Sequence, residues 1–162
     1  MSRFTRSLGV VAVTATLSVA AVGPLTTQGD VDAARYPGRR VVALVNVRRV
    51  EAGLRPVRLH LDIHTAARKH SADQARMNRM THIGSDGSNA GQRISREGYR
   101  WSAWGENVAM GYPTPRAVVR AWMHSPGHRA NILTRSFRHI GVGVRRSSNG
   151  TIYWTLDLAR PG

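Results

Sequence analysis

The C-terminal part of the chain constrains the fold most strongly. Two extended runs, Ile140–Val144 and Thr151–Leu158, flank a turn that contains Asn149-Gly150. An Asn-Gly pair between such runs is typical of a β-hairpin, because both residues readily adopt the positive φ angles of a tight hairpin turn. The helical patterns all lie before this hairpin. We therefore predict an α+β protein in which helices form layers on an antiparallel sheet.

Two long segments before the hairpin have helical spacing. Apolar residues between Val41 and Val50 recur at intervals of three and four, and Gly53 is expected just past the end of that helix. The segment Asp62–Met80 shows the same periodicity, with Asp62 near its start. Both segments are predicted to be amphipathic helices.

Shorter elements are indicated by capping patterns. Asn89 and Gln92 have the spacing of a capping box, and Thr114-Pro115 is typical of a helix start. Ser125-Pro126 ends that helix and can begin another short one. A short strand is expected at Val108–Met110.

The N-terminal residues predict export. A basic stretch precedes the apolar run Leu8–Val22, which is shorter than the roughly 20 residues of a comfortable membrane span. We predict a signal peptide over residues 1–23, a linker over 24–37 and a single domain over 38–162. An uncleaved membrane anchor is the alternative. The mature protein is therefore expected to be secreted, and we expect a monomer.

The chain is strongly basic. It has 24 Lys and Arg residues against 9 Asp and Glu, a net charge of +15, and the arginines are dispersed in pairs along the domain. Such an excess attracts polyanions. After export, anionic cell-envelope polymers or lipids are the expected partners, and a merely solvated surface is the alternative. Specific nucleic-acid binding is not expected, because no recognition helix or aromatic-interleaved strand motif is present.

The absence of cysteine excludes several kinds of chemistry. There are no disulfides, no thiolate metal ligands and no thiol nucleophile. A Gly-x-Ser-x-Gly nucleophile motif is also missing from the sequence. Any metal must be held by His, Asp or Glu.

Three residues on separate segments are the main candidates for metal binding or catalysis. They are His82, His128 and Glu106, the last of which lies in a Gly-Glu-Asn turn. Their two imidazoles and one carboxylate are able to fill three ligand positions of a zinc ion and leave the fourth for water. Without a ligand, Glu106 is able to pair with a protonated histidine and hold the site closed. A metal site, a structural clasp and a catalytic centre all stay open at this point.

The other titratable residues have simpler interpretations. His70 lies on an apolar helix face and is expected in the core, whereas His60 and His64 are expected at a helix start or on the surface. Glu51 and Glu97 are expected on helix surfaces. The aromatic residues near Glu106 are expected to pack in the core or at the rim, although they could stack on sugars or a lipid.

A family resemblance is carried by motifs in a fixed order. These are Leu44-Val-Asn46, Glu51-Ala-Gly-Leu54-Arg-Pro56, Met80-Thr-His82, Gly98-Tyr99, Trp104-Gly-Glu-Asn107, Ala121-Trp122, His124-Ser-Pro-Gly-His-Arg129, Asn131-Ile-Leu133 and Gly141-Val-Gly143. Over residues 38–159 the sequence resembles the bacterial branch of the CAP superfamily, which includes cysteine-rich secretory, antigen-five and pathogenesis-related proteins. Its module is also called the SCP domain.

The resemblance implies a three-layer α-β-α sandwich with a central, mainly antiparallel sheet and a central cleft. In many members the cleft holds two His and two Glu, and some bind a divalent metal there. His82, Glu106 and His128 match three of these positions and would be the metal ligands, with zinc as an example of the metal. Ser125 stands where the second Glu is found.

These observations together predict a function. We expect a secreted, non-catalytic binding module whose cleft holds a divalent metal or a small ligand. A metal-assisted hydrolase, acting on peptides or envelope polymers, is one alternative. A lipid or sterol carrier is the other.

Overall fold

A computed structural model describes residues 36–162 of the chain. The predicted signal peptide and all but the last residues of the predicted linker lie outside the described residues. The elements are α2 (Pro37–Glu51), β1 (Arg58–Leu59), α3 (Leu61–Met77), α4 (Ala90–Arg96), β2 (Trp101–Met110), α5 (Pro115–His124), α6 (Pro126–Leu133), β3 (His139–Arg146) and β4 (Ile152–Pro161).

The centre of the molecule is a four-stranded sheet with the order β1-β3-β4-β2. Strands β3 and β4 pair antiparallel through the predicted hairpin, with Val142 opposite Leu156. Strand β2 pairs antiparallel with the other edge of β4, and only the short β1 runs parallel to its neighbour. The prediction of a mainly antiparallel sheet is confirmed.

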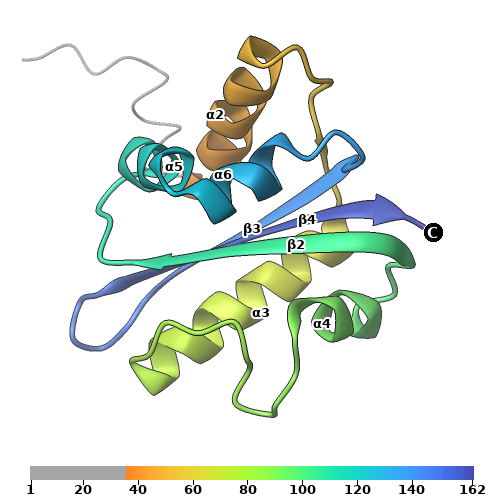
Figure 1. The fold of residues 1–162 in the computed structure, drawn as a ribbon. Helices are drawn as coiled ribbons and strands as arrows, with labels where there is room; N and C mark the ends of the chain where they lie inside the picture. Colours follow the sequence, from red (N-terminus) through yellow and green to blue (C-terminus); the bar gives the residue numbers. More distant parts are fainter. Residues whose placement is uncertain (1–35) are drawn as a thin grey trace, which may run out of the picture.

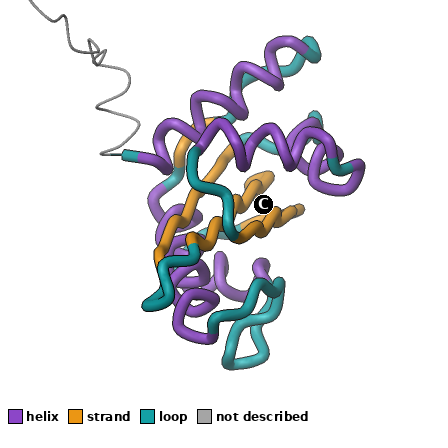
Figure 2. Tube along the Cα trace, turned by 90° about the vertical axis from the view of Figure 1, so that its left-hand side faces the viewer, coloured by secondary structure: helices purple, strands orange, loops and turns teal. Residues whose placement is uncertain are grey.

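Helices cover both faces of the sheet. In Figure 1, α2, α5 and α6 lie above the strands, and α3 and α4 lie below them. Figure 2 shows the same order of helix, strand and helix from the side. The larger apolar cluster lies between α2, α5, α6 and the sheet and contains Val41, Val45, Trp122 and Leu156. The predicted three-layer α-β-α sandwich is therefore confirmed.

Two glycines in β3 let α3 lie close against the sheet. A Cβ atom at Gly141 would be 2.3 Å from the carbonyl carbon of Ile63, and one at Gly143 would be 2.0 Å from the carbonyl oxygen of Ala67. No side chain fits at either position without moving the helix. This close approach determines the distance between α3 and the sheet. It therefore also positions His70, which lies on α3.

The helix boundaries follow local capping chemistry. Asn89 Oδ1 accepts from the Gln92 amide at 2.9 Å, and Gln92 Oε1 accepts from the Asn89 amide at 2.9 Å, so the capping box is confirmed. Helix α3 ends at Met77 rather than at the predicted Met80. The reason is Asn78, whose left-handed backbone (φ 49°) stops the helix, as Asn does more readily than most residues.

The prediction for the Glu106 segment was wrong in one respect. A turn followed by a strand over residues 108–110 was expected, but β2 is continuous over Trp101–Met110. The segment is held extended by its pairing with β4, which places Glu106 opposite Asp157. Glu106 is thus presented from a strand, and its neighbours in the chain face the other side of the sheet.

Arg49 also differs from expectation. It belongs to one of the arginine pairs dispersed along the domain, for which a surface position is expected, yet it is fully buried. It follows Val41 and Val45 at helical spacing on the inner face of α2. Its guanidinium donates to the carbonyl oxygens of Ile132 at 2.6 Å and Thr134 at 3.0 Å, so it ties α2 to the end of α6.

None of the helices within residues 36–162 is long and apolar enough to cross a membrane.

Candidate functional site

The alternation of β2 directs neighbouring side chains to opposite sides of the sheet. Glu106 points toward α3 and α4, where it is 5% exposed. Asn107 points toward α6 and donates to the carbonyl oxygen of His128 at 3.0 Å. Asn131 of α6 donates to the Asn107 side chain at 2.9 Å and to the Glu106 carbonyl oxygen at 3.1 Å. The Gly-Glu-Asn motif therefore joins the two helical layers through one strand.

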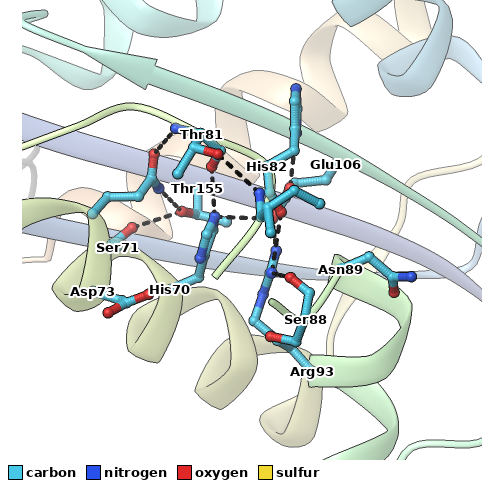
Figure 3. A network of polar contacts seen from close by, with 12 residues as sticks. His70, Ser71, Asp73, Thr81, His82, Ser88, Asn89, Arg93, Glu106 and Thr155 are labelled. Carbon is cyan, nitrogen blue, oxygen red and sulfur yellow. Dashed lines mark hydrogen bonds and ion pairs between the residues drawn. The ribbon is translucent and has the colours of Figure 1, made fainter. Parts of the chain in front are cut away.

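Both carboxylate oxygens of Glu106 are engaged by cationic groups. Arg93 Nη2 lies 2.6 Å from Oε2, and His82 Nδ1 lies 2.8 Å from Oε1. His70 Nε2 is 3.8 Å from Oε2. Figure 3 shows His82 and Arg93 reaching Glu106 from different sides. Such charge-assisted contacts are stronger than neutral hydrogen bonds.

Arg93 also fixes the segment between α3 and α4. Its Nη1 donates to the carbonyl oxygens of Ser88 at 2.7 Å and His82 at 3.1 Å. The side chain is 9% exposed. Arg93 was not predicted as a site residue. Its signal was the capping box, because a helix that begins after Asn89 turns Arg93 and Ile94 inward.

The pKa values of the two histidines beside Glu106 are shifted in opposite directions. The hydrogen bond that His82 Nδ1 donates to the Glu106 carboxylate raises the pKa of His82 above its usual value, although partial burial opposes this shift. Burial lowers the pKa of His70, which is therefore neutral at pH 7. His70 Nε2 lies 2.8 Å from the carbonyl oxygen of Thr81, so this nitrogen must carry the proton. The prediction of a core position for His70 is confirmed.

Asp157 is a second acid at the site and was also not predicted. It is fully buried on β4, directly opposite Glu106. Burial, followed by the charge of Glu106, raises the pKa of Asp157 well above its usual value. The protonated carboxyl is able to donate to Glu106. Among the described residues neither Asp157 oxygen has a hydrogen-bond partner in this arrangement. The site thus combines a neutral acid with a carboxylate, as expected when two carboxyls share a buried space.

His128 lies at the first turn of α6 and is half-buried. Within residues 36–162, no hydrogen bond or ion pair joins its side chain to Glu106 or His82. Burial, and then the charge of His82, lower the pKa of His128. The structure thus brings together His82 and Glu106 but leaves His128 out of the contact. Ser125 is the residue before α6 and makes no side-chain cap there.

The arrangement does not fit a metal centre. The part of the chain that the structure describes has no group of three or more His, Asp or Glu side chains that could hold a metal ion. Arg93 already occupies Oε2 of Glu106, and a divalent ion at Oε1 would have to replace the contact with His82 Nδ1. The metal site at His82, Glu106 and His128 stays a prediction, and the geometry favours the clasp.

The remaining predicted residues lie outside this network. Glu51 pairs with Arg48 at the surface, as expected, whereas Glu97, which pairs with Lys69, has a side chain that is only 18% exposed. His60 precedes α3 and stacks edge-on against the buried Tyr99. Of the aromatic side chains near Glu106, Tyr99 is in the core, while Trp101, Trp104 and Tyr112 are partly exposed at the rim.

Comparisons with known proteins agree with the fold and the motifs. The model of the family described as "CAP: Cysteine-rich secretory protein family" matches residues 42–158. The chain is 38% identical over 120 residues to the uncharacterized protein YkwD of Bacillus subtilis, covering 74% of this chain and 46% of that protein. It is 32% identical over 124 residues to the uncharacterized membrane protein YlbC of the same organism, covering 75% and 34%. The chain thus spans less than half the length of these relatives.

Solved structures show the same architecture. An extracellular protein containing an SCP domain from Bacillus anthracis is similar with a TM-score of 0.71 and 25% identity, over 85% of this chain and 45% of that one. An outer surface protein from Borrelia burgdorferi reaches the same TM-score of 0.71 at 17% identity, over 76% of this chain and 92% of that one. The second likeness concerns the fold alone.

Proposed function

The chain belongs to the cysteine-rich secretory protein family, and we propose that it is a secreted, non-catalytic binding module that adheres to anionic polymers or lipids of the cell envelope. The observation that carries this proposal is the closed state of Glu106. Both of its oxygens are engaged, by Arg93 and by His82. A carboxylate held in this way stabilises the fold rather than serving a substrate.

Catalysis would need a free acid, base or nucleophile at the site. Glu106 is paired, Asp157 is buried with a raised pKa, and His70 is buried and hydrogen-bonded to Thr81. General acid–base catalysis requires a group within reach of the proton it transfers. Of these groups only His82 has a largely exposed side chain, and its Nδ1 is committed to Glu106. This distribution supports binding over turnover.

The surface charge supports a polyanionic partner. The acidic residues are too few to balance the 24 basic ones, and no acid lies within residues 1–23, so removal of a signal peptide would leave the excess in place. Exposed arginines occur on α2 (Arg39 and Arg40) and at the end of β3 (Arg145 and Arg146). A positive field of this kind attracts phosphate-rich surfaces and weakens with added salt.

Co-sedimentation with vesicles tests the proposal. The full chain is mixed with phosphatidylglycerol or phosphatidylcholine vesicles at 50 and 500 mM salt. Between these concentrations the Debye screening length falls from roughly 10 Å to a few Å, so charge attraction is strong at the first and weak at the second. We expect binding to the anionic vesicles at low salt, loss of binding at high salt, and competition by poly(glycerol phosphate). Equal binding to both lipids, or none, would overturn it.

Matched variants separate the surface from the clasp. Replacing Arg145 and Arg146 by Gln is expected to weaken vesicle binding, whereas Glu106→Gln leaves it unchanged. The same samples are incubated with casein and with isolated wall material. A hydrolytic product that disappears in Glu106→Gln would contradict the non-catalytic part of the proposal.

A further inference from the structure

A groove of about 450 Å³ lies along the outer edge of β3, and we call it the β3-edge groove. Strand β1 covers that edge only as far as Ile140, so among the described residues no strand lies beside the rest of it. Helices α2 and α3 reach the edge from opposite faces of the sheet (Figure 1). The walls of the groove include Tyr36, Arg39, His64, Arg68, Val142 and Val144. Its volume is in the range of small-ligand sites, roughly 300–1,000 Å³.

The charged walls of the groove are all basic. Arg39 lies in the first turn of α2 and Arg68 lies on α3, and both residues are exposed. None of the residues from 36 to 162 that line the groove is acidic, and within those residues neither arginine has an ion pair. The hollow between α2, α5 and α6 is different, because it contains Glu51, which pairs with Arg48. The β3-edge groove therefore presents positive charge that no acid in its walls offsets.

His64 indicates that the two arginine charges converge on the groove. Its ring is half-buried against β3, where Nδ1 accepts from the amide of Val142 at 3.4 Å. Burial lowers the pKa of His64, and the charges of Arg68 and Arg39 lower it further. Exposed charges act over no more than about 10 Å at ordinary salt, so guanidinium groups from two helices lie near this one ring. The other ring nitrogen, Nε2, has no partner in residues 36–162 and is not closed to solvent.

The fold holds several donors of the groove in place. The guanidinium carbon of Arg39 lies 5.1 Å from the centre of the Tyr36 ring, and this contact limits its freedom. Alternate residues of a strand point their amides to the same edge, and the Val142 amide points outward to His64. The Val144 amide is therefore directed to the same side, where no strand in the described part of the chain pairs with it. Side-chain and backbone N–H groups thus meet at one place.

A phosphodiester suits this arrangement better than a carboxylate does. The oxygens of a phosphate point in different directions and accept from groups on separate elements, and guanidinium groups bind phosphate through paired hydrogen bonds. A carboxylate has only two oxygens, which lie in one plane. The groove of about 450 Å³ also has room for the units that a phosphate links, since a water molecule occupies roughly 30 Å³ in the liquid. A groove along a strand edge suits a linear chain, whereas a lipid headgroup stays in the plane of its bilayer.

We propose that the β3-edge groove binds one phosphodiester unit of a polyol phosphate chain, with Arg39 and Arg68 donating to the phosphate oxygens and His64 beside them. The proposal deepens the adhesion to anionic envelope polymers given above and rests on it for the class of partner. It adds that one groove, rather than the positive field of the whole surface, recognises the phosphate.

Calorimetry of the full chain with a short poly(glycerol phosphate) oligomer tests the groove. We expect saturable binding whose dissociation constant rises about tenfold in Arg39→Gln and in Arg68→Gln, because each variant loses a charge-assisted hydrogen bond. Arg40→Gln is the matched control, since Arg40 is an exposed neighbour on α2 that does not line the groove. Equal weakening in Arg39→Gln and Arg40→Gln would overturn the proposal, and so would the absence of saturable binding.

An NMR titration with the same oligomer locates the ligand. Bound phosphate is expected to raise the pKa of His64, because its charge offsets those of Arg39 and Arg68. His124, an exposed histidine that does not line the groove, is the internal control and should keep its pKa. An unchanged pKa of His64 at saturating oligomer would place the ligand elsewhere and contradict the proposal.

Phosphatidylglycerol vesicles separate the groove from the general adhesion. If Arg68→Gln weakens binding to the vesicles but not to the oligomer, the groove takes a lipid headgroup and the proposal is wrong. Vesicle binding without saturable oligomer binding would leave the adhesion intact and rule out the groove. Saturable, Arg68-dependent oligomer binding by a chain that ignores the vesicles would do the reverse.

Discussion

Glu106 and Asp157 face each other across the pairing of β2 with β4, so two acids share one buried site. Only one of them is compensated by cations. Arg93 and His82 pair with the Glu106 carboxylate, while burial and the nearby Glu106 charge raise the pKa of Asp157. These pairings lead us to expect that the stability of the protein depends on pH through this site.

Asp157→Asn is expected to change how stability depends on pH. The raised pKa of Asp157 means that the folded protein binds more protons than the unfolded chain above about pH 4, so this group destabilises the fold progressively as pH rises through its folded pKa. Asparagine does not ionise, so it removes this pH-dependent destabilisation, and its amide is able to donate a hydrogen bond to Glu106. The stability of Asp157→Asn relative to wild type should therefore increase from pH 4 to pH 8 in urea unfolding. Glu51→Gln, which alters a surface acid, should show no such trend.

Arg93→Ala is expected to destabilise the protein by about 3–5 kcal/mol, because it leaves a buried carboxylate uncompensated. Chemical unfolding at pH 7 measures this loss. The loss should be smaller when Arg93→Ala is made in a Glu106→Gln background, since the remaining partner is neutral. Arg48→Ala, which breaks an exposed pair with Glu51, should have little effect. Additive losses in the double variant would show that Arg93 and Glu106 are not coupled.

The pKa of His82 should lie above the usual histidine value because of its hydrogen bond to Glu106. Since the folded pKa is the higher one, the stabilising contribution of His82 is fully present below about pH 6.5 and is lost as pH rises through the folded value. His82→Gln should therefore differ from wild type most in mildly acidic solution and converge with it at high pH. An NMR titration of the imidazole gives the pKa itself. No downward shift of that pKa in Glu106→Gln would rule out the pairing as its cause.

Zinc is expected to produce no heat of binding in calorimetry at pH 7. Arg93 neutralises Glu106, and His128 contributes no ligand to the site in this arrangement. Stoichiometric binding that is lost in both His82→Ala and His128→Ala would instead establish the three-residue metal site. Magnesium is the control, since imidazole is a poor ligand for it.

Much of the fold could be predicted because its signals are local. The hairpin around Asn149-Gly150 and the capping box at Asn89 each depend on residues a few positions apart, and both are present. The extent of β2 could not be predicted in this way. Its glycine and polar residues do not form a strand by propensity, and the segment is extended because β4 supplies its hydrogen-bond partners.

The candidate site was predicted in part. His82 and Glu106 were expected to meet, and they do. Asp157 was missed because nothing in its neighbourhood marks a buried charge, and Arg93 was missed although the capping box places it on the inward face of its helix. An arginine in a basic sequence is normally a surface residue, and an aspartate in an apolar strand has no local partner.

The sequence by itself determined the fold class, the layered arrangement of helices and strands, and the family, because these depend on periodicity, caps and ordered motifs. Only the tertiary structure decided what Glu106 does. Its carboxylate pairs with Arg93, which is 13 residues away in the chain, and it lies opposite Asp157 on the neighbouring strand. Charges separated in this way affect one another only when folding brings them into a shared space of low dielectric constant, where their pairing and their pKa values are determined together.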